Sequence, residues 1–307
     1  MHLYCHYMKR KVAKIGPSTL MVSLPSRWVK QHNINKGDEL DVIEQGHTLA
    51  VSLRSAQKGD YGTVTSTHRD LIKRYLNSLY RRGYDEVKIV CDQPLSINQL
   101  TREISQLLGF EIIEHTKNSF VVKIISESID NEFDTIFNRI FLINISLGRE
   151  SYETIKNKKF DQLEHVQVVE ATNNKLTNLC LRILNKKGHK EPDKITTLSM
   201  IVTGLERIGD YYRDICRFLI GKKSATITKE TLQFYADVND LFEYLYRHKH
   251  KFRDIMYAFR TKRNAIMKRY LALIETKNKE ESVILSYLFG ILKETIEMEL
   301  IFLDLTL

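Results

Sequence analysis

The second half of the chain sets the strongest constraint on the fold. From about residue 128 onward, apolar residues recur at helical spacing and no segment alternates convincingly like a strand. The 307 residues include only 4 Pro and 13 Gly, so few positions interrupt long helices, and the composition disfavours an all-β fold. The pattern predicts an all-α region of six helices, at roughly 129–156, 160–187, 193–221, 228–249, 251–277 and 280–305.

The six predicted helices fall into two groups of three with related sequences. Residues 159–163 resemble residues 251–255 at an offset of 92, and residues 205–210 align with 292–297 at an offset of 87. The connection before the third helix is about eight residues long in the first group and about three in the second, which explains the different offsets. We therefore expect two three-helix repeats.

Residues 9–54 predict a small unit of strands with one short helix. Apolar residues alternate over 11–15 and 40–51, a second apolar run covers 20–24, and Pro25 suits the first turn of a helix. The expected buried side chains of this helix are Leu24, Trp28, Val29 and Ile34. About 45 residues are too few for an independent core without a metal or a disulfide, so we expect a second chain to complete the unit as a homodimer or a higher oligomer.

Residues 66–126 predict a small α/β module between these two regions. An amphipathic helix over 67–82 ends at Gly83, a natural stop for a helix. The remaining predicted elements are a strand at 86–91, a helix at 96–108, and strands at 110–115 and 120–125.

The composition favours a polyanionic partner in a reducing compartment. Lysine and arginine exceed aspartate and glutamate by 47 to 38, and the net charge of +9 suits nucleic acid or an anionic membrane surface. The chain has no apolar run of 18 residues and no secretory signal, so we expect a cytoplasmic protein that is not inserted in a membrane. The four cysteines are too far apart in sequence for a zinc or disulfide motif: Cys5, Cys91, Cys180 and Cys216.

No pattern indicates an enzyme. The sequence has no nucleophile and base arrangement and no phosphate-binding glycine loop. His248 and His250 lie at the basic end of a predicted helix, where solvation or helix capping is the expected role.

The N-terminal sequence resembles the AbrB/SpoVT swapped-hairpin domain. The resemblance runs from Lys9-Arg10-Lys11 through Gly16-Pro17-Ser18 and Leu24-Pro25-Ser26-Arg27-Trp28 to Gly37-Asp38-Glu39-Leu40-Asp41-Val42. It implies a domain-swapped homodimer that binds duplex DNA through its first strands and the adjoining loop. Trp28, Leu24 and Leu40 are then expected in the core, and Gly37-Asp38 in a turn.

The residues that this resemblance assigns to DNA are basic or hydroxyl side chains: Lys9, Arg10, Lys11, Lys14, Ser18, Arg27 and Lys30. With Lys36, the segment up to residue 36 holds seven lysine and arginine side chains and no carboxylate. Two copies would place about 14 positive charges on one small head, enough for a surface that follows phosphates.

The third predicted helix resembles the signature helix of PhoU, a phosphate-signalling regulator with two three-helix repeats. The matching stretch is Leu205-Glu206-Arg207-Ile208-Gly209-Asp210-Tyr211-Tyr212-Arg213-Asp214-Ile215. As a whole, the order of parts resembles the archaeal phosphate uptake regulators. The expected boundaries are 8–54 for the DNA-binding domain, 66–126 for the α/β module and 128–307 for the PhoU-like domain.

The PhoU resemblance implies candidate ligands for an iron or zinc cluster, and we expect no other cofactor. Glu206, Asp210 and Asp214 are spaced to share one helix face, and Glu297 occupies the corresponding position of the second repeat. Lys293, Asn173 and Thr177 stand where further acids would be expected, so we expect the metal site to be degraded. An ion pair of Glu206 with Lys293 or Arg207 is the structural alternative.

Two functions remain open at this point. The leading hypothesis is a dimeric, DNA-binding transcriptional regulator of phosphate uptake and phosphate homeostasis. The alternative is a PhoU-type signalling adaptor that binds a phosphate transporter or sensor protein, with the N-terminal domain serving only for dimerisation.

Overall fold

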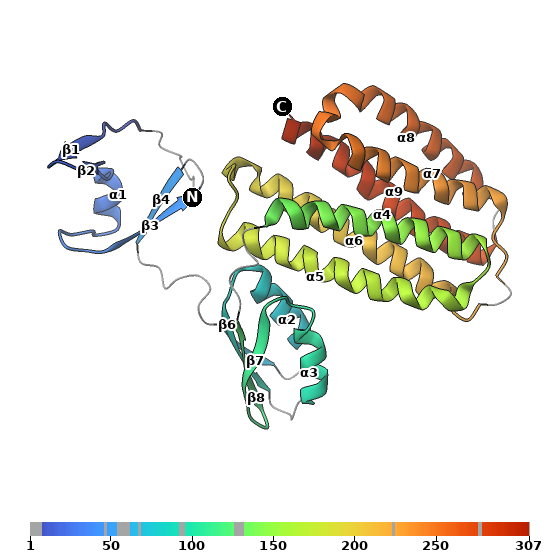
Figure 1. The fold of residues 1–307 in the computed structure, drawn as a ribbon, viewed down its shortest axis with the longest axis horizontal. Helices are drawn as coiled ribbons and strands as arrows, with labels where there is room; N and C mark the ends of the chain where they lie inside the picture. Colours follow the sequence, from blue (N-terminus) through green and yellow to red (C-terminus); the bar gives the residue numbers. More distant parts are fainter. Residues whose placement is uncertain are drawn as a thin grey trace. The chain divides into compact units, whose positions relative to one another are not determined.

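The computed structural model describes residues 8–45, 48–53, 62–66, 69–91, 96–125, 132–222, 225–275 and 278–306. The chain divides into two compact units (Figure 1). The first comprises residues 1–43 and 49–55, and the second comprises residues 44–48 and 56–307.

The N-terminal unit contains short strands and one short helix. β1 (Ala13–Ile15) pairs antiparallel with β2 (Thr19–Met21), and Gly16 takes a positive φ of 75° in the turn between them. α1 (Ser26–Gln31) follows, with Pro25 at its N-cap, and β3 (Leu40–Gln45) pairs with β4 (Thr48–Leu53). The prediction of strands around a short helix beginning near Pro25 is confirmed.

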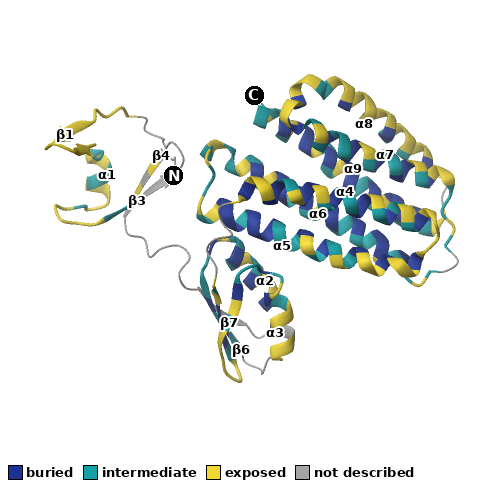
Figure 2. Cartoon of the chain, in the orientation of Figure 1, coloured by how far each residue is buried: buried dark blue, intermediate teal, exposed yellow. Residues whose placement is uncertain are grey.

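A single copy of this unit does not bury a hydrophobic core. No residue of α1 is buried, and the expected core residues Leu24, Trp28 and Ile34 are only half-buried. Large apolar side chains remain exposed on the strands, with Leu20 and Leu49 each 69% exposed, and the unit is largely exposed in Figure 2. We therefore expect a second protein surface to cover the exposed apolar side chains of this unit.

The middle module is a four-stranded sheet with helices. The strand order is β5 (Gly62–Ser66), β6 (Glu86–Cys91), β8 (Ser119–Ile124) and β7 (Phe110–His115). β5 and β6 are parallel and are connected through α2 (Arg69–Arg81), whereas the pairs that involve β8 are antiparallel. α3 (Ile97–Ile104) is shorter than predicted, and β5 was not predicted at all.

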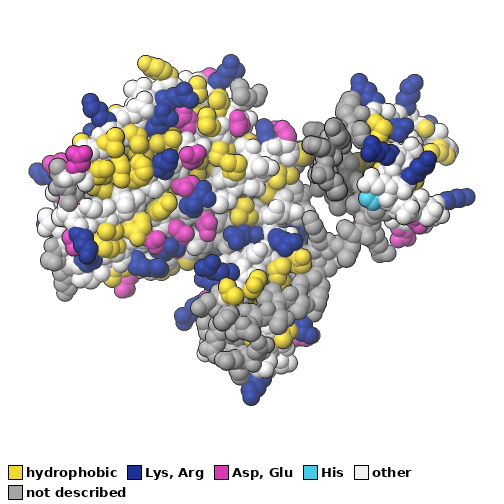
Figure 3. All heavy atoms as spheres, turned by 180° about the vertical axis from the view of Figure 1, so that it is seen from behind, with side chains coloured by type: hydrophobic (Ala, Val, Ile, Leu, Met, Phe, Trp, Pro, Cys, Tyr) yellow, Lys and Arg dark blue, Asp and Glu magenta, His cyan; other side chains and the backbone are white. Residues whose placement is uncertain are grey.

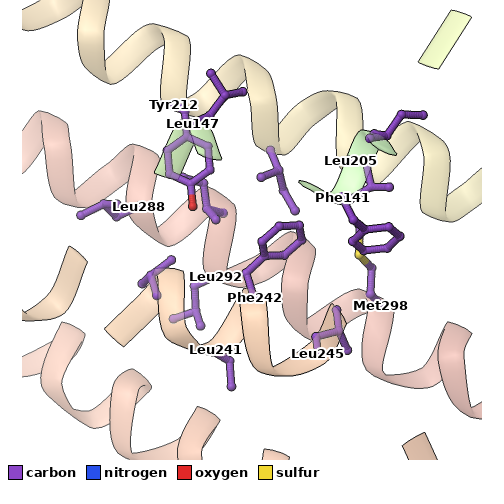
Figure 4. Close-up of a cluster of buried hydrophobic side chains, with 14 of the residues drawn as sticks. Phe141, Leu147, Leu205, Tyr212, Leu241, Phe242, Leu245, Leu288, Leu292 and Met298 are labelled. Atoms are coloured by element: carbon purple, nitrogen blue, oxygen red, sulfur yellow. The ribbon is translucent and has the colours of Figure 1, made fainter. Parts of the chain in front are cut away.

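The helical region matches its prediction closely. The described part of residues 133–306 contains six long helices: α4 (Phe133–Lys156), α5 (Glu164–Lys186), α6 (Ile195–Leu219), α7 (Lys229–His248), α8 (Phe252–Ile274) and α9 (Lys279–Thr306). One continuous core joins the first three helices to the last three. Phe141 of α4 stacks on Phe242 of α7 with ring centroids 5.9 Å apart, and both belong to the same buried cluster as Met298 of α9 (Figure 4).

The contact between α6 and α9 follows the predicted internal repeat. A Cβ at Gly204 would lie 2.7 Å from the methyl group of Met298, and a Cβ at Gly290 would lie 2.6 Å from the ring of Tyr211. Tyr211 and Met298 are 87 positions apart, the offset that relates the two repeats in the sequence. Tyr211 and Met298 therefore each meet a glycine of the opposite helix, although these glycines are 86 positions apart and not 87.

A buried arginine joins the middle module to the helical bundle. Arg182 of α5 is 1% exposed and donates hydrogen bonds to the carbonyl oxygens of Tyr80 and Tyr84, at 3.1 and 2.7 Å. Its guanidinium also pairs with Asp85 at 2.5 Å, and Lys186 binds the same carboxylate. Sequence reasoning did not single out Arg182, although a charged residue inside the apolar stripe of α5 is a signal that could have identified it.

Candidate functional site

The residues predicted to bind DNA are all exposed on the N-terminal unit. Lys9, Arg10 and Lys11 precede β1, Lys14 lies within it, and Ser18 stands in the turn before β2. Because side chains alternate along a strand, Lys14 lies on the opposite face of β1 from Ala13 and Ile15. Lys14 pairs with Leu20 across the hairpin, so these two side chains share one face, while Ala13, Ile15, Thr19 and Met21 lie on the other.

Helix α1 adds two more basic side chains. Arg27 and Lys30 are both exposed, and their spacing of three residues makes them neighbours on the helix surface. Figure 3 shows lysine and arginine side chains distributed over the visible face of this unit. Since residues 8–36 contain no carboxylate, this stretch offers a phosphate backbone only attractive charges.

The acidic residues of α6 surround an arginine. Arg213 pairs with Asp214 at 3.0 Å, with Glu170 of α5 at 3.0 Å, and also with Asp210. Each of these carboxylates could contribute to a cation site, but the guanidinium already stands among them. Sequence reasoning placed Asp210 and Asp214 here and missed both Arg213 and Glu170.

The other two candidate metal ligands do not join this cluster through any contact between described residues. Glu206 is half-buried, and its pKa is raised first by burial and then by the charge of Asp210. Glu297 lies on α9, is 64% exposed at its side chain, and has Lys293 as its ion-pair partner at 3.7 Å. In the part of the chain that the structure describes, no three His, Cys, Asp or Glu side chains are grouped to hold a metal.

The ion pair predicted for this region involves different residues. Arg207 pairs through two nitrogens with Glu294 of α9, at 2.7 and 2.6 Å, and not with Glu206. Lys293 pairs with Glu297 rather than with Glu206. Among the described residues, Arg207 and Lys293 thus form their ion pairs with carboxylates of α9, and Glu206 acts on Arg207 only through its charge.

Glu170 has the most unusual environment in the cluster. Its side chain is 4% exposed, and burial raises its pKa to about 7, although the charge of Arg213 opposes the shift. A hydrogen bond and charge repulsion from Asp210 raise the pKa further. Glu170 therefore changes protonation near neutral pH.

The positions expected to carry acids on α5 are instead part of an uncharged polar core. Asn173 is fully buried and donates to the carbonyl oxygen of Leu205, while Asn144 of α4 donates to the Asn173 side chain at 3.0 Å. Thr177 is also buried and donates to the Asn174 carbonyl oxygen. The Asn144 and Asn173 amides connect α4, α5 and α6, whereas the Thr177 hydroxyl bonds within α5, and none of the three adds an anionic ligand.

Two domain models match separate parts of the sequence. Residues 14–53 match the model described as antidote-toxin recognition MazE, bacterial antitoxin, and residues 142–219 match the PhoU domain. The order expected from the resemblances, an AbrB-like domain followed by a PhoU domain, is confirmed. The PhoU match covers α4, α5 and α6 from within α4 onward, which is the first of the two repeats.

The other comparisons add no relative. No curated protein and no solved structure matches the chain.

Among the described helices, none combines the length and the apolar character needed to cross a bilayer.

Proposed function

We propose that this protein is a dimeric, DNA-binding transcriptional regulator of phosphate uptake. The N-terminal unit supplies the contact with duplex DNA, and the helical bundle supplies the link to phosphate status. The MazE/AbrB-like match supports a role in DNA binding or dimerisation, and the PhoU match supports a role in phosphate homeostasis. Neither domain model describes a catalytic function.

One observation carries the DNA-binding half of this proposal. The predicted contact residues are exposed, basic and free of carboxylate neighbours in sequence over residues 8–36. Lys14 and the apolar Ile15 face opposite ways on β1. Because Leu20 shares the Lys14 face, a dimer that leaves Lys14 available to a duplex would bury other apolar side chains of the unit, such as Val42 and Leu49.

Dimerisation is supported by the exposed apolar surface of the same unit. Val12, Leu20, Val42 and Leu49 are each at least 60% exposed in a single copy. A second copy presents the same surface, so two copies can bury it mutually through a two-fold interface. Two units of this size, paired, would provide the core that one lacks.

The decisive experiment measures binding to duplex DNA as salt increases. Affinity should fall steeply, with a log-log slope of roughly −0.9 for each phosphate neutralised. The double variant Arg10→Ala, Lys14→Ala should bind more weakly and show a slope shallower by about 2. The matched control removes two exposed lysines from the bundle, Lys268→Ala with Lys293→Ala, and should leave both affinity and slope unchanged.

The adaptor hypothesis gives the opposite result in this experiment. If the N-terminal unit only dimerises, the Arg10→Ala, Lys14→Ala variant will bind DNA as the wild type does. Equal affinity and equal salt slope in the two proteins would therefore remove the proposed DNA surface. A bundle that retains binding to a phosphate transporter or sensor protein would then become the favoured function.

A further inference from the structure

A pocket of about 510 Å³ lies at one end of the helical bundle and collects positive charge. Its walls come from the beginning of α4, the connection between α5 and α6, the turn between α7 and α8, and the end of α9. The charged and titratable residues that line it are Asp134, His189, Lys190, Glu191, Lys194, Lys249 and His250. Phe137, Leu198, Phe302 and Leu305 form its apolar walls.

Both carboxylates in this pocket are already neutralised. Asp134 accepts a hydrogen bond from Lys190 at 2.9 Å, and Glu191 pairs with Lys194 at 2.5 Å. Lys249 has no carboxylate partner among the described residues, whereas the carboxylates of Asp134 and Glu191 act on His250 and His189, respectively, only through their charge. The pocket therefore has a surplus of cationic groups.

Lys249 is the residue that most needs explanation. It is only 8% exposed, and its amino group lies 4.1 Å from the ring centroid of Tyr246 and 5.8 Å from that of Phe141. These aromatic faces are its only charge-stabilising contacts in the described structure. Burial lowers the pKa of this lysine, as expected for a cation removed from water without an anion beside it.

Two further features favour an anion here. Asp134 is in the first turn of α4 and Leu198 is in the first turn of α6, so the first turns of both helices contribute to the pocket lining. Helix amino ends carry partial positive charge and unpaired N–H groups. His250 has a pKa lowered by burial and by Lys249, with Asp134 opposing the shift, and a bound anion would reverse that depression.

We propose that this pocket binds a phosphate group, with the buried Lys249 as the central cation and His250 and His189 at its sides. The volume admits either inorganic phosphate or a small phosphate monoester, whose organic part would contact the apolar walls. As the effector site of the bundle, the pocket would make the activity of the regulator depend on the phosphate concentration. That effector role rests on the proposed function, whereas phosphate binding itself does not.

Equilibrium dialysis with labelled inorganic phosphate tests the site directly, in a buffer of about 0.15 M chloride that screens exposed charges. The full chain should bind phosphate, and phosphate should raise its melting temperature. Lys249→Met, which keeps the length of the side chain and removes its charge, should weaken binding about tenfold or more. Lys268→Met, an exposed lysine on α8, is the matched control and should bind as the wild type does.

His250→Gln gives an independent variant, because His250 is exposed and its replacement does not threaten the fold. It should weaken phosphate binding severalfold. The melting temperature of Lys249→Met without phosphate should equal or exceed that of the wild type, since a costly buried charge is gone. Binding by Lys249→Met equal to wild-type binding, or no phosphate binding by the wild type, would overturn the proposal.

Two further experiments distinguish inorganic phosphate from a phosphate ester, and phosphate binding from the effector role. Glycerol 3-phosphate in place of inorganic phosphate shows whether an ester binds more tightly at the same residues. The Arg10→Ala, Lys14→Ala variant should bind phosphate normally, so a failure of the DNA surface leaves this result intact. At constant ionic strength, phosphate should change the DNA affinity of the wild type but not of Lys249→Met, and an unchanged wild type would contradict the effector role.

Discussion

Arg213 and Glu170 together determine the charge state of the cluster between α5 and α6. The guanidinium lies 3.0 Å from Glu170 and from Asp214, so it balances carboxylates that would otherwise repel one another. Burial nevertheless raises the pKa of Glu170 to about 7. The cluster therefore carries one fewer negative charge at acidic pH than at alkaline pH.

The raised pKa of Glu170 predicts a pH-dependent loss of stability. A group with a folded-state pKa of about 7 and an unfolded value of 4.5 stabilises the fold below 4.5 and loses that contribution as the pH rises through 7. Glu170→Gln removes the titration. The melting temperature of the wild type should therefore fall relative to this variant between about pH 5 and pH 8, by the equivalent of roughly 3 kcal/mol or less.

Glu164, an exposed residue on the same helix, supplies the control for this titration. Glu164→Gln should shift the melting temperature by a similar amount at every pH in the range. If the difference between wild type and Glu170→Gln is constant across these pH values, the buried carboxyl does not titrate near neutrality.

The candidate metal ligands predict weak metal binding by the protein as purified. Arg213 competes for Asp210 and Asp214, while Glu297 pairs with Lys293 away from them. Elemental analysis of protein prepared without chelator should find iron and zinc well below one equivalent, with any affinity strongly dependent on pH. Stoichiometric metal that disappears in Asp210→Ala would show that the carboxylates form a working site despite the arginine.

In the middle module, three of the four strands follow from the sequence pattern, and the fourth, β5, does not. β6, β7 and β8 have runs of branched and aromatic residues that alternate, whereas β5 consists of Gly62-Thr63-Val64-Thr65-Ser66 with a single large apolar side chain. Its strand conformation depends on parallel pairing with β6, a tertiary contact that local pattern does not contain.

Helix α5 depends on Arg182 to hold the middle module. Arg182→Met should destabilise the protein by about 3 to 5 kcal/mol, because it leaves two backbone carbonyls without their buried donor and leaves Asp85 with Lys186 alone. Calorimetry should then resolve separate melting of the module and the bundle. Arg149→Met, which breaks an exposed pair with Glu243, should cost under about 1 kcal/mol, and equal effects of the two variants would contradict the anchoring role.

For the whole molecule, the exposed apolar surface of the N-terminal unit predicts an obligate dimer. Leu49→Asp places a charge on that surface and should convert the full chain to a monomer in sedimentation experiments. Leu271→Asp alters a leucine of similar exposure on α8 and should remain dimeric. A dimer that survives Leu49→Asp would place the subunit interface elsewhere.

The two candidate sites differ in how far the sequence predicts them. The basic surface could be predicted, because Lys14 and Arg10 belong to a short carboxylate-free stretch whose chemistry needs little tertiary information. The pocket around Lys249 could not, because its residues come from four separate connections and helix ends. Likewise, the role of Glu170 could not be predicted, because it depends on the packing of α5 against Arg213 of α6.

The most direct test of the account uses a fragment of residues 1–56 with a short DNA duplex in sedimentation velocity. The fragment should sediment as a dimer, dissociate on dilution with loss of structure, and bind the duplex with an affinity that falls steeply as salt increases. A dimeric fragment that does not bind DNA at low salt would contradict the central claim and would leave dimerisation as the only role of the N-terminal unit.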